Sequence, residues 1–317
     1  MHKQNTIQRA KCQGGIQQTE SDGHVTTQQG QRTIWFHAKT TFLFTKGDFK
    51  SVVWPQSLFA YSVAVASGGR EGLWSRVPLM LLWLWIHLLV EDISNQRLPK
   101  SILEDRVNKP WRPIPAGRLS PAEAQQALQA VVPLTMCLST LLGSLAPSTA
   151  LLSLIWLYND LDVSSTGPLI RNSVNALGLG CFGWGAVSVL LGEQGVDGDS
   201  QQCWVLLTTL AVATTIHAQD LPDMAGDAMR GRRTVPLVHG ESAARCSVSI
   251  LVPVWTVVCL IFWDGGYWAR WVAFPVSIVV SLVVMTQRGV QCGAMAWQLW
   301  CIWITTIYAI PLLAKVA

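Results

Sequence analysis

Long apolar windows that contain no charged residue recur along this chain, and they constrain its fold more than any other feature. Six of them cover residues 124–159, 172–192, 202–219, 246–263, 271–287 and 289–314. Each is near or above the roughly 20 residues that a helix needs to cross the hydrocarbon core of a bilayer. Only 13% of the 317 residues are charged, whereas a soluble domain carries about 25%. The sequence therefore predicts an all-α integral membrane protein.

The apolar pattern predicts about nine transmembrane helices in a single membrane domain over residues 51–317. The window 124–159 is too long for one span, and the GSLAPS stretch at 143–148 divides it into a hairpin of two helices. The predicted helices cover residues 51–67, 77–92, 121–142, 146–159, 172–192, 202–221, 245–263, 268–287 and 291–314.

Residues 1–50 differ in kind from the rest of the chain. They are rich in Gln, Thr, Lys and Gly and contain no long apolar run, which excludes a signal peptide with its own hydrophobic region. Such a composition predicts a flexible polar tail.

The distribution of basic residues predicts the orientation. With nine spans, the polar links 91–120, 158–171, 220–245 and 287–290 fall on one side and together carry twelve Lys and Arg, against four on the other side. The positive-inside rule places the richer side in the cytosol. We expect a multi-pass protein of the endoplasmic reticulum membrane, with no obligatory protein partner. The net charge of +4 is modest, so it is interpreted as a feature of membrane topology and does not indicate nucleic-acid binding.

Three aspartates follow the apolar window 202–219, in the stretch HAQDLPDMAGD. Asp220, Asp223 and Asp227 have the spacing i, i+3, i+7, which puts them on one face of a helix. Three stacked carboxylates repel one another unless a cation lies among them. Hard oxygen ligands suit Mg²⁺, which keeps several waters and bridges to phosphate oxygens. The trio predicts a magnesium site.

The loop DISNQRLPKSILEDRVNKPWRPIPAGR at 92–118 supplies complementary groups. Its candidate oxygen ligands are Asn95, Glu104 and Asp105. Its cations Lys109, Arg112 and Arg118 suit a phosphorylated group. By parity both loops lie on the same side of the membrane, so together they could hold Mg²⁺ and a diphosphate. Taken alone, each cluster also matches a solvated helix end or a topogenic basic excess, and their joint occurrence favours the metal–diphosphate site.

A third polar link, residues 158–178, predicts further lining of an active site. It opens with Tyr158 and Asn159, and Arg171 and Asn175 follow at the start of the next span. Polar groups on a membrane helix face the bundle interior, where they line a site or join helices by hydrogen bonds. A few tryptophans could also line a cavity that stabilises a cation; the candidates are Trp83, Trp85, Trp156 and Trp184.

These motifs together resemble the UbiA superfamily of intramembrane isoprenoid-diphosphate enzymes, over most of the chain after residue 50. The run NKPWRPIPAGR at 108–118 is similar to the RPLPSG-like end of the first family loop. Asp220, Asp223 and Asp227 match the second family motif, DxxDxxxD, in full. The resemblance implies the family bundle of nine helices around a central cavity.

The first motif departs from the family pattern NDxxDxxxD. Gln96 and Pro99 stand where its first two aspartates fall, and the third falls near Leu103 or Glu104. The link after the fourth helix lacks the Lys-Arg pair of many aromatic prenyltransferases. In these respects the chain is similar to the fungal branch that contains membrane-bound terpene cyclases.

The resemblance implies a Mg²⁺-dependent class I reaction on a linear prenyl diphosphate, with farnesyl diphosphate as the first candidate substrate. Asn95, Asp105, Asp220 and Asp227 become the leading metal ligands, with Glu104 and Asp223 behind them. Asn95, Asp220 and Asp227 are also the candidate catalytic residues. Arg232 joins the diphosphate-binding cations. Two alternatives stay open: a prenyltransferase that passes the cation to an aromatic or other acceptor, and a transporter that uses the acidic face as a cation site.

Overall fold

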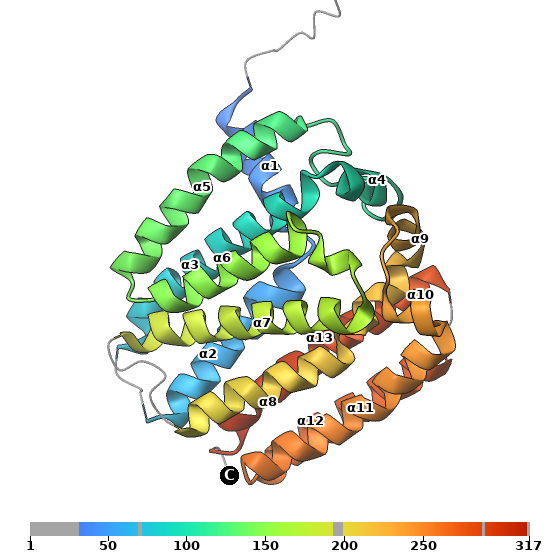
Figure 1. Cartoon of the computed structure of the whole chain (residues 1–317). Coiled ribbons are helices and arrows are strands. Elements are labelled where there is room, and N and C mark those ends of the chain that lie inside the picture. Colours follow the sequence, from blue (N-terminus) through green and yellow to red (C-terminus); the bar gives the residue numbers. More distant parts are fainter. Residues whose placement is uncertain (1–31, 69–71, 193–198, 287–288, 316–317) are drawn as a thin grey trace, which may run out of the picture.

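The computed structural model describes residues 32–68, 72–192, 199–286 and 289–315, and every regular element within them is a helix. Figure 1 shows the longer helices packed side by side in one bundle. Each of the nine predicted helices has a counterpart. These are α2 (Trp54–Ala66), α3 (Leu73–Gln96), α5 (Pro121–Leu141), α6 (Leu145–Asn159), α7 (Pro168–Leu191), α8 (Asp199–Thr215), α11 (Glu241–Phe262), α12 (Tyr267–Thr286) and α13 (Val290–Leu313). The all-α prediction is confirmed.

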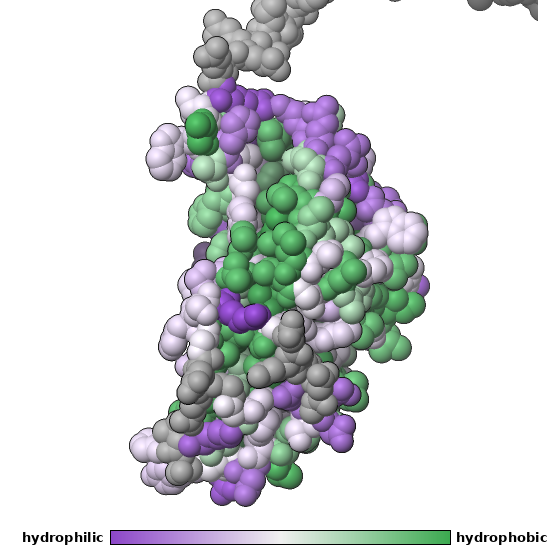
Figure 2. All heavy atoms as spheres, turned by 90° about the vertical axis from the view of Figure 1, so that its left-hand side faces the viewer, coloured by the Kyte–Doolittle hydropathy of each residue, from purple (hydrophilic) through white to green (hydrophobic). Residues whose placement is uncertain are grey.

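Five helices of the described residues are long and apolar enough to cross a membrane: α3, α7, α11, α12 and residues Gln291–Leu313 of α13. The helices α2, α6 and α8 are shorter, with 13, 15 and 17 residues. Length and hydropathy therefore establish a multi-pass membrane protein but do not reach the predicted nine crossings. An apolar band runs across the middle of the face in Figure 2, and hydrophilic residues gather above it.

The predicted tail is wrong for its last part, because residues 34–45 form a helix. In α1 (Ile34–Thr45) the side chain of Thr33 caps the N-terminus by accepting a hydrogen bond from the Phe36 amide. A π-helical turn, Phe49–Val53, then leads directly into α2. The α1 helix packs on α3, so the folded domain begins well before residue 51. Residues 1–31 of the predicted tail lie outside the described part of the chain.

The polar loops contain three short helices that position the candidate site: α4 (Pro99–Asn108), α9 (Asp220–Arg230) and α10 (Val235–His239). The predicted helix 202–221 is wrong at its end, because α8 stops at Thr215 and a 3₁₀ turn, Ile216–Gln219, separates it from α9. Since α9 starts at Asp220, its direction is set independently of α8, and α9 packs against α4. Both lie on the right of the bundle in Figure 1.

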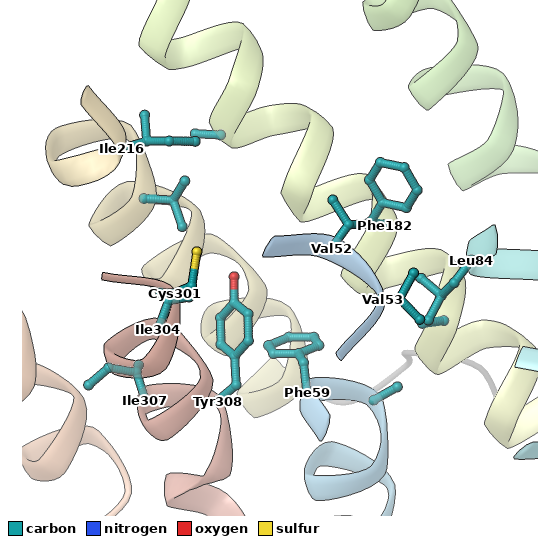
Figure 3. Close-up of a cluster of buried hydrophobic side chains, with 14 of the residues drawn as sticks. Val52, Val53, Phe59, Leu84, Phe182, Ile216, Cys301, Ile304, Ile307 and Tyr308 are labelled. Atoms are coloured by element: carbon teal, nitrogen blue, oxygen red, sulfur yellow. The ribbon is translucent and has the colours of Figure 1, made fainter. Parts of the chain in front are cut away.

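The apolar core lies directly beside the polar end of the bundle. Figure 3 shows buried side chains from the π-helical turn, α2, α3, α7 and α13 gathered in one cluster. Phe59 and Tyr308 meet edge to face within it, with ring centroids 4.9 Å apart. Where α3 packs against α7, Gly185 of α7 allows the fully buried ring of Trp83 on α3 to approach the α7 backbone. A Cβ at residue 185 would lie 2.0 Å from Trp83 Cη2.

We predict that Gly185→Ala lowers the free energy of unfolding by roughly 1–3 kcal/mol, because the added methyl must displace a buried tryptophan. Gly178→Ala on the same helix is the matched control, since a Cβ there meets no atom within 4 Å. The measurement is thermal unfolding of both variants in detergent. Equal melting temperatures for the two variants would contradict this packing.

Candidate active site

One cavity, of about 160 Å³, opens between α3, α6, α7 and the two acidic helices α4 and α9. Its lining is chemically mixed. It combines polar and charged side chains from α3, α4, α6, α7, α9 and the links between helices with the apolar side chains of Leu151, Ile155, Phe182, Ile216 and Trp297. Several of these apolar side chains belong to the core cluster of Figure 3. A charged group and an apolar chain can therefore be held in one continuous space.

Each carboxylate of the α9 trio pairs with its own cation. Arg171 Nη2 lies 2.8 Å from Asp220 Oδ1, and Lys109 Nζ lies 3.1 Å from Asp223 Oδ2. The third pair joins Arg232 Nη1 and Asp227 Oδ1 over 3.3 Å. The three cations come from α7, from the loop after α4 and from the loop after α9. Cations from three separate parts of the chain therefore relieve the repulsion within the trio. The same ion pairs hold these three parts against α9.

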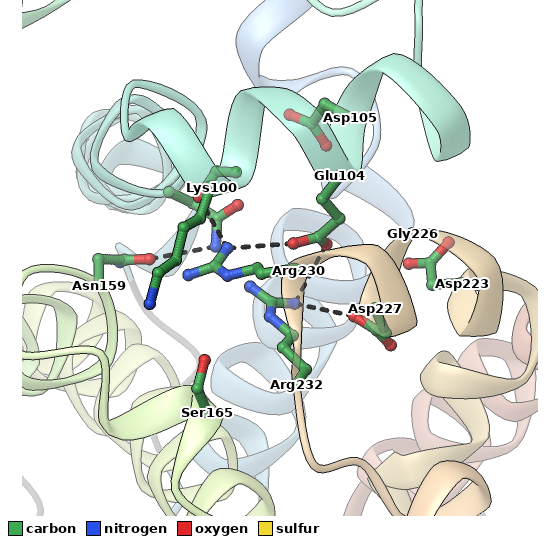
Figure 4. A network of polar contacts seen from close by, with 12 residues as sticks. Lys100, Glu104, Asp105, Asn159, Ser165, Asp223, Gly226, Asp227, Arg230 and Arg232 are labelled. Atoms are coloured by element: carbon green, nitrogen blue, oxygen red, sulfur yellow. Dashed lines mark hydrogen bonds and ion pairs between the residues drawn. The ribbon is translucent and has the colours of Figure 1, made fainter. Parts of the chain in front are cut away.

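The two polar loops lie against each other, which confirms the prediction from parity. Glu104 of α4 accepts hydrogen bonds from Arg230 and Arg232, at 3.1 and 3.2 Å. Asn108 donates to the Asp223 carbonyl oxygen and accepts from the Gly226 amide, both over 3.1 Å. Figure 4 shows Glu104 pointing toward Arg230, the last residue of α9, and Arg232, which follows the helix.

Arg112 is the centre of a second group of carboxylates. Its Nη1 donates to both oxygens of Asp105, at 2.8 and 3.1 Å. Its Nη2 lies 3.6 Å from Asp48 and 3.9 Å from Asp92. Asp105 points away from Arg230 and Arg232 in Figure 4 and does not line the cavity, whereas Glu104 does.

Residues of the third polar link complete the cavity wall. Arg171 Nη1 donates to the hydroxyl of Tyr158, and Asn95 donates from Nδ2 to Asn159 Oδ1 over 3.1 Å. Asn175 lies beside them on α7. These five residues were predicted to belong to one site, and in the structure all of them line the cavity.

Ten of the fourteen predicted site residues line the cavity. Asp105, Asp220 and Asp227 lie behind it, each paired with a lining arginine. Arg118, which was predicted to contact diphosphate, does not line the cavity. Its guanidinium donates to Thr40 Oγ1 and to the Phe36 carbonyl oxygen of α1, at 3.0 and 3.2 Å, so it fastens α1 rather than facing the cavity.

Sequence reasoning missed several lining residues. Asp48 lay in the stretch predicted to be a flexible tail, where no pattern pointed to the site. Glu91 and Asp92 stand inside an apolar helix, and Glu91 precedes Asn95 by one turn, which was an available signal. The four tryptophan candidates were wrong, since none lines the cavity; Trp83 is packed in the core, and Trp297 lines the wall instead.

Burial sets the ionisation of the site. It raises the pKa of the Asp227 carboxyl to about 7, although Arg171 and Arg232 oppose the shift. Burial also raises the pKa of Asp105, against the effect of Arg112 and Lys109. For Lys109, burial alone would lower the pKa, but Asp223 raises it above its ordinary value. The lysine therefore stays charged, while Asp227 lies close to a change of protonation at neutral pH.

Two buried carboxylate oxygens on α9 have no hydrogen-bond partner: Asp220 Oδ2 and Asp227 Oδ2. Both side chains are fully buried, so each oxygen keeps a free lone pair in a region of low dielectric, which is costly without a cation. Within the described residues no three His, Cys, Asp or Glu side chains converge closely enough to cage a metal on their own. The donor set fits Mg²⁺ that shares its ligands with a bound phosphate, because Mg²⁺ sites use one or two carboxylates and several waters.

A sequence profile of the UbiA prenyltransferase family matches residues 52–302. The chain belongs to this family. Among curated UbiA-type relatives, the fumagillin beta-trans-bergamotene synthase af520 of Aspergillus fumigatus is 31% identical over 226 residues, 71% of this chain and 75% of that protein. The polyprenyl transferase eriF of Hericium erinaceus is 29% identical over 240 residues, 71% of this chain and 76% of that protein.

The UbiA fold is also shared with a solved structure of a UbiA homolog from Archaeoglobus fulgidus bound to GPP and Mg²⁺. It aligns with a TM-score of 0.58 at 14% identity, over 86% of this chain and 99% of the homolog. This likeness confirms the predicted UbiA-like helical fold and does not test the predicted number of crossings.

Asp162, in the link between α6 and α7, joins that link to the acidic helices. It accepts from Lys100 Nζ at 2.8 Å and from Ser165 Oγ at 2.7 Å, and it lies 3.5 Å from Arg230 Nη2. Partial burial alone would raise its pKa, but the hydrogen bonds from Lys100 and Ser165 hold the pKa of Asp162 below its ordinary value of 3.8.

A carboxyl whose pKa is lowered by folding stabilises the protein above its unfolded pKa and loses that contribution as the pH falls through the folded value. We predict that Asp162→Asn lowers the free energy of unfolding at pH 7 by less than about 1 kcal/mol, because the ion pairs are partly exposed. The loss is measured as a lower melting temperature. The difference is expected to vanish as the pH falls below about 4. Asn tolerates the left-handed φ of 52° at this position. A pH-independent difference between the two melting curves would contradict the ionic origin.

Proposed function

We propose that this UbiA-family protein is a membrane-bound, Mg²⁺-dependent class I terpene cyclase. It ionises a linear prenyl diphosphate, with farnesyl diphosphate as the first candidate, and the allylic cation closes on its own double bonds. The observation that carries the proposal is a single cavity lined both by cations paired with carboxylates and by apolar side chains. That combination suits a substrate with a charged head and a hydrocarbon chain.

The cations of the site are the groups that bind the diphosphate. Lys109, Arg112, Arg171 and Arg232 all line the cavity, and positive groups aimed at the departing oxygens stabilise the charge that develops there. Arginines bind phosphate oxygens by a bidentate fork, and lysine acts as a point charge. Each of these cations is held by carboxylates, which fixes its position before the substrate arrives.

Asp220 and Asp227, with Asn95 and the carboxylates of Glu104 and Asp223, are the residues that would hold Mg²⁺. The two unpartnered oxygens on α9 supply the strongest support for this assignment. The metal neutralises the leaving diphosphate as a Lewis acid when it is bound. The apolar wall formed by Leu151, Ile155 and Phe182 excludes water from the cation.

The membrane arrangement follows from the same proposal. The four helices α2, α5, α6 and α8 complete nine crossings together with the five established apolar helices, and the loops that carry α4 and α9 face the cytosol from the endoplasmic reticulum membrane. The excess of Lys and Arg on that side supports this orientation.

A prenyltransferase is the second candidate, and it is supported by the similarity to the polyprenyl transferase eriF. Two observations favour the cyclase. The link after α6 has Asn159 and Asp160 and lacks the Lys-Arg pair of many aromatic prenyltransferases in the UbiA superfamily. In addition, the relative from Aspergillus fumigatus with 31% identity is named a beta-trans-bergamotene synthase.

Membranes that contain the full chain are incubated with C10, C15 or C20 prenyl diphosphate and Mg²⁺, without any acceptor. We predict diphosphate release together with a cyclic hydrocarbon, measured by phosphate assay and by gas chromatography with mass spectrometry. Asp220→Asn is expected to reduce diphosphate release by about 10²-fold or more, as for loss of one preorganised electrostatic contact.

The exposed residue Asp264, in the turn between α11 and α12, offers the control. Asp264→Asn removes one negative charge outside the cavity and is expected to leave both readouts unchanged. Turnover only after an aromatic acceptor is added would favour the transferase. Full activity of Asp220→Asn would exclude the proposed role of the α9 trio.

A further inference from the structure

Glu91 differs from the other carboxylates that line the cavity. In the described part of the chain these are Asp48, Glu91, Asp92, Glu104 and Asp223. Asp48 and Asp92 share Arg112, Glu104 is paired with two arginines, and Asp223 is paired with Lys109. Glu91 alone among them has no hydrogen bond and no ion pair within this part of the structure.

Arg112, a cation that lines the same cavity, makes no hydrogen bond or ion pair with Glu91. Arg112 Nη1 is occupied by both oxygens of Asp105, and its Nη2 faces Asp48 and Asp92. Three carboxylates therefore share one guanidinium, and Glu91 receives none of its hydrogen bonds. An unpaired carboxylate in a membrane helix is costly, and such residues mark function by default.

Glu91 also lies one helical turn further from the acidic loops than the predicted metal ligand Asn95. It precedes Asn95 by four residues on α3, so the two side chains share one helix face and are separated by one turn, about 6 Å along the axis. The α3 helix ends at Gln96 toward the acidic loops, and its direction toward Glu91 leads into the bundle. Apolar residues such as Ile155 and Phe182 line the same cavity.

We propose that Glu91 is the catalytic base that ends the cyclisation, an inference that rests on the proposed cyclase function. A carbon–hydrogen bond next to the cationic carbon breaks, and its electron pair becomes the new carbon–carbon double bond. The proton bonds to a carboxylate oxygen of Glu91. The step converts a cation and a carboxylate into a neutral hydrocarbon and a neutral carboxylic acid, and it requires no further reactant.

The lack of a partner suits this role. A carboxylate held by arginine is a poorer proton acceptor, because the ion pair stabilises its charged form. An unpaired carboxylate attracts a hydrocarbon cation through a medium of low dielectric and keeps a lone pair free to accept the proton. Asp48, whose side chain retains 31% exposure and lines the same cavity, gives the proton a route to water before the next turnover.

The test compares the full-length protein with Glu91→Gln and Glu91→Asp in membranes supplied with the prenyl diphosphate that supports turnover. Two quantities are measured in each reaction: diphosphate released, and the amount of every hydrocarbon or alcohol formed. Glu91→Gln keeps the size of the side chain and removes the base. Asp264→Asn again removes a carboxylate away from the cavity and serves as the matched control.

We expect Glu91→Gln to retain diphosphate release within a few-fold, while the main hydrocarbon per diphosphate released falls by about 10²-fold, the lower part of what a positioned base contributes. Alcohols formed by water capture, or isomeric alkenes, are expected in its place. Glu91→Asp restores part of the main hydrocarbon with an altered ratio of isomers, because the base remains but is withdrawn by one methylene.

An unchanged product distribution in Glu91→Gln would overturn the proposal and indicate diphosphate as the base. Loss of diphosphate release from a folded Glu91→Gln would assign Glu91 to ionisation and would also overturn it. If Glu91→Gln fails to fold, Glu91→Asp decides, since an isomer ratio equal to that of the native protein contradicts the proposal. Absence of any acceptor-free turnover in the native protein would instead reject the cyclase function itself.

Discussion

The pairing of three aspartates with three cations organises the polar end of this protein. Asp220, Asp223 and Asp227 repel one another on one face of α9, and each is neutralised by a cation from a different element. Because these cations arrive from α7, the loop after α4 and the loop after α9, the charges of the trio hold three parts of the chain around one cavity. The same pairs keep lysine and arginine side chains in place for an anionic ligand.

The cavity joins two environments that a membrane protein usually keeps apart. Its charged side chains come from loops, from the short helices α4 and α9 and from the ends of the long helices α3 and α7, and several of its apolar side chains belong to the helix-packed core. Burial of the charges makes each interaction stronger and each unpaired group more costly. The two free oxygens on α9 and the unpaired Glu91 are therefore the positions where a ligand or a reacting cation would compensate most.

Much of this arrangement was predictable from the sequence, because a bilayer forces apolar residues into helices. Each of the nine predicted helices has a counterpart, although α1, α4, α9 and α10 were not among them. Parity placed the loops containing Glu104 and Asp223 on the same side of the membrane, and in the structure these loops are in contact. The contribution of the N-terminal stretch was not predictable, because α1 carries no long apolar window and its contacts with Arg118 and α3 are tertiary. Asp48 reaches the cavity only through that packing. Glu91, by contrast, was detectable as a charge one turn from Asn95 within an apolar helix.

The central claim is that the α9 trio and the facing loop bind Mg²⁺ together with a diphosphate. The most direct test is a structure of the protein with Mn²⁺ in place of Mg²⁺ and an unreactive prenyl thiolodiphosphate, in which anomalous scattering locates the metal. We predict a metal peak within about 2.0–2.3 Å of carboxylate oxygens of Asp220 or Asp227, with the diphosphate contacted by Lys109 and Arg232. A metal peak away from α9, or a diphosphate outside this cavity, would contradict the account.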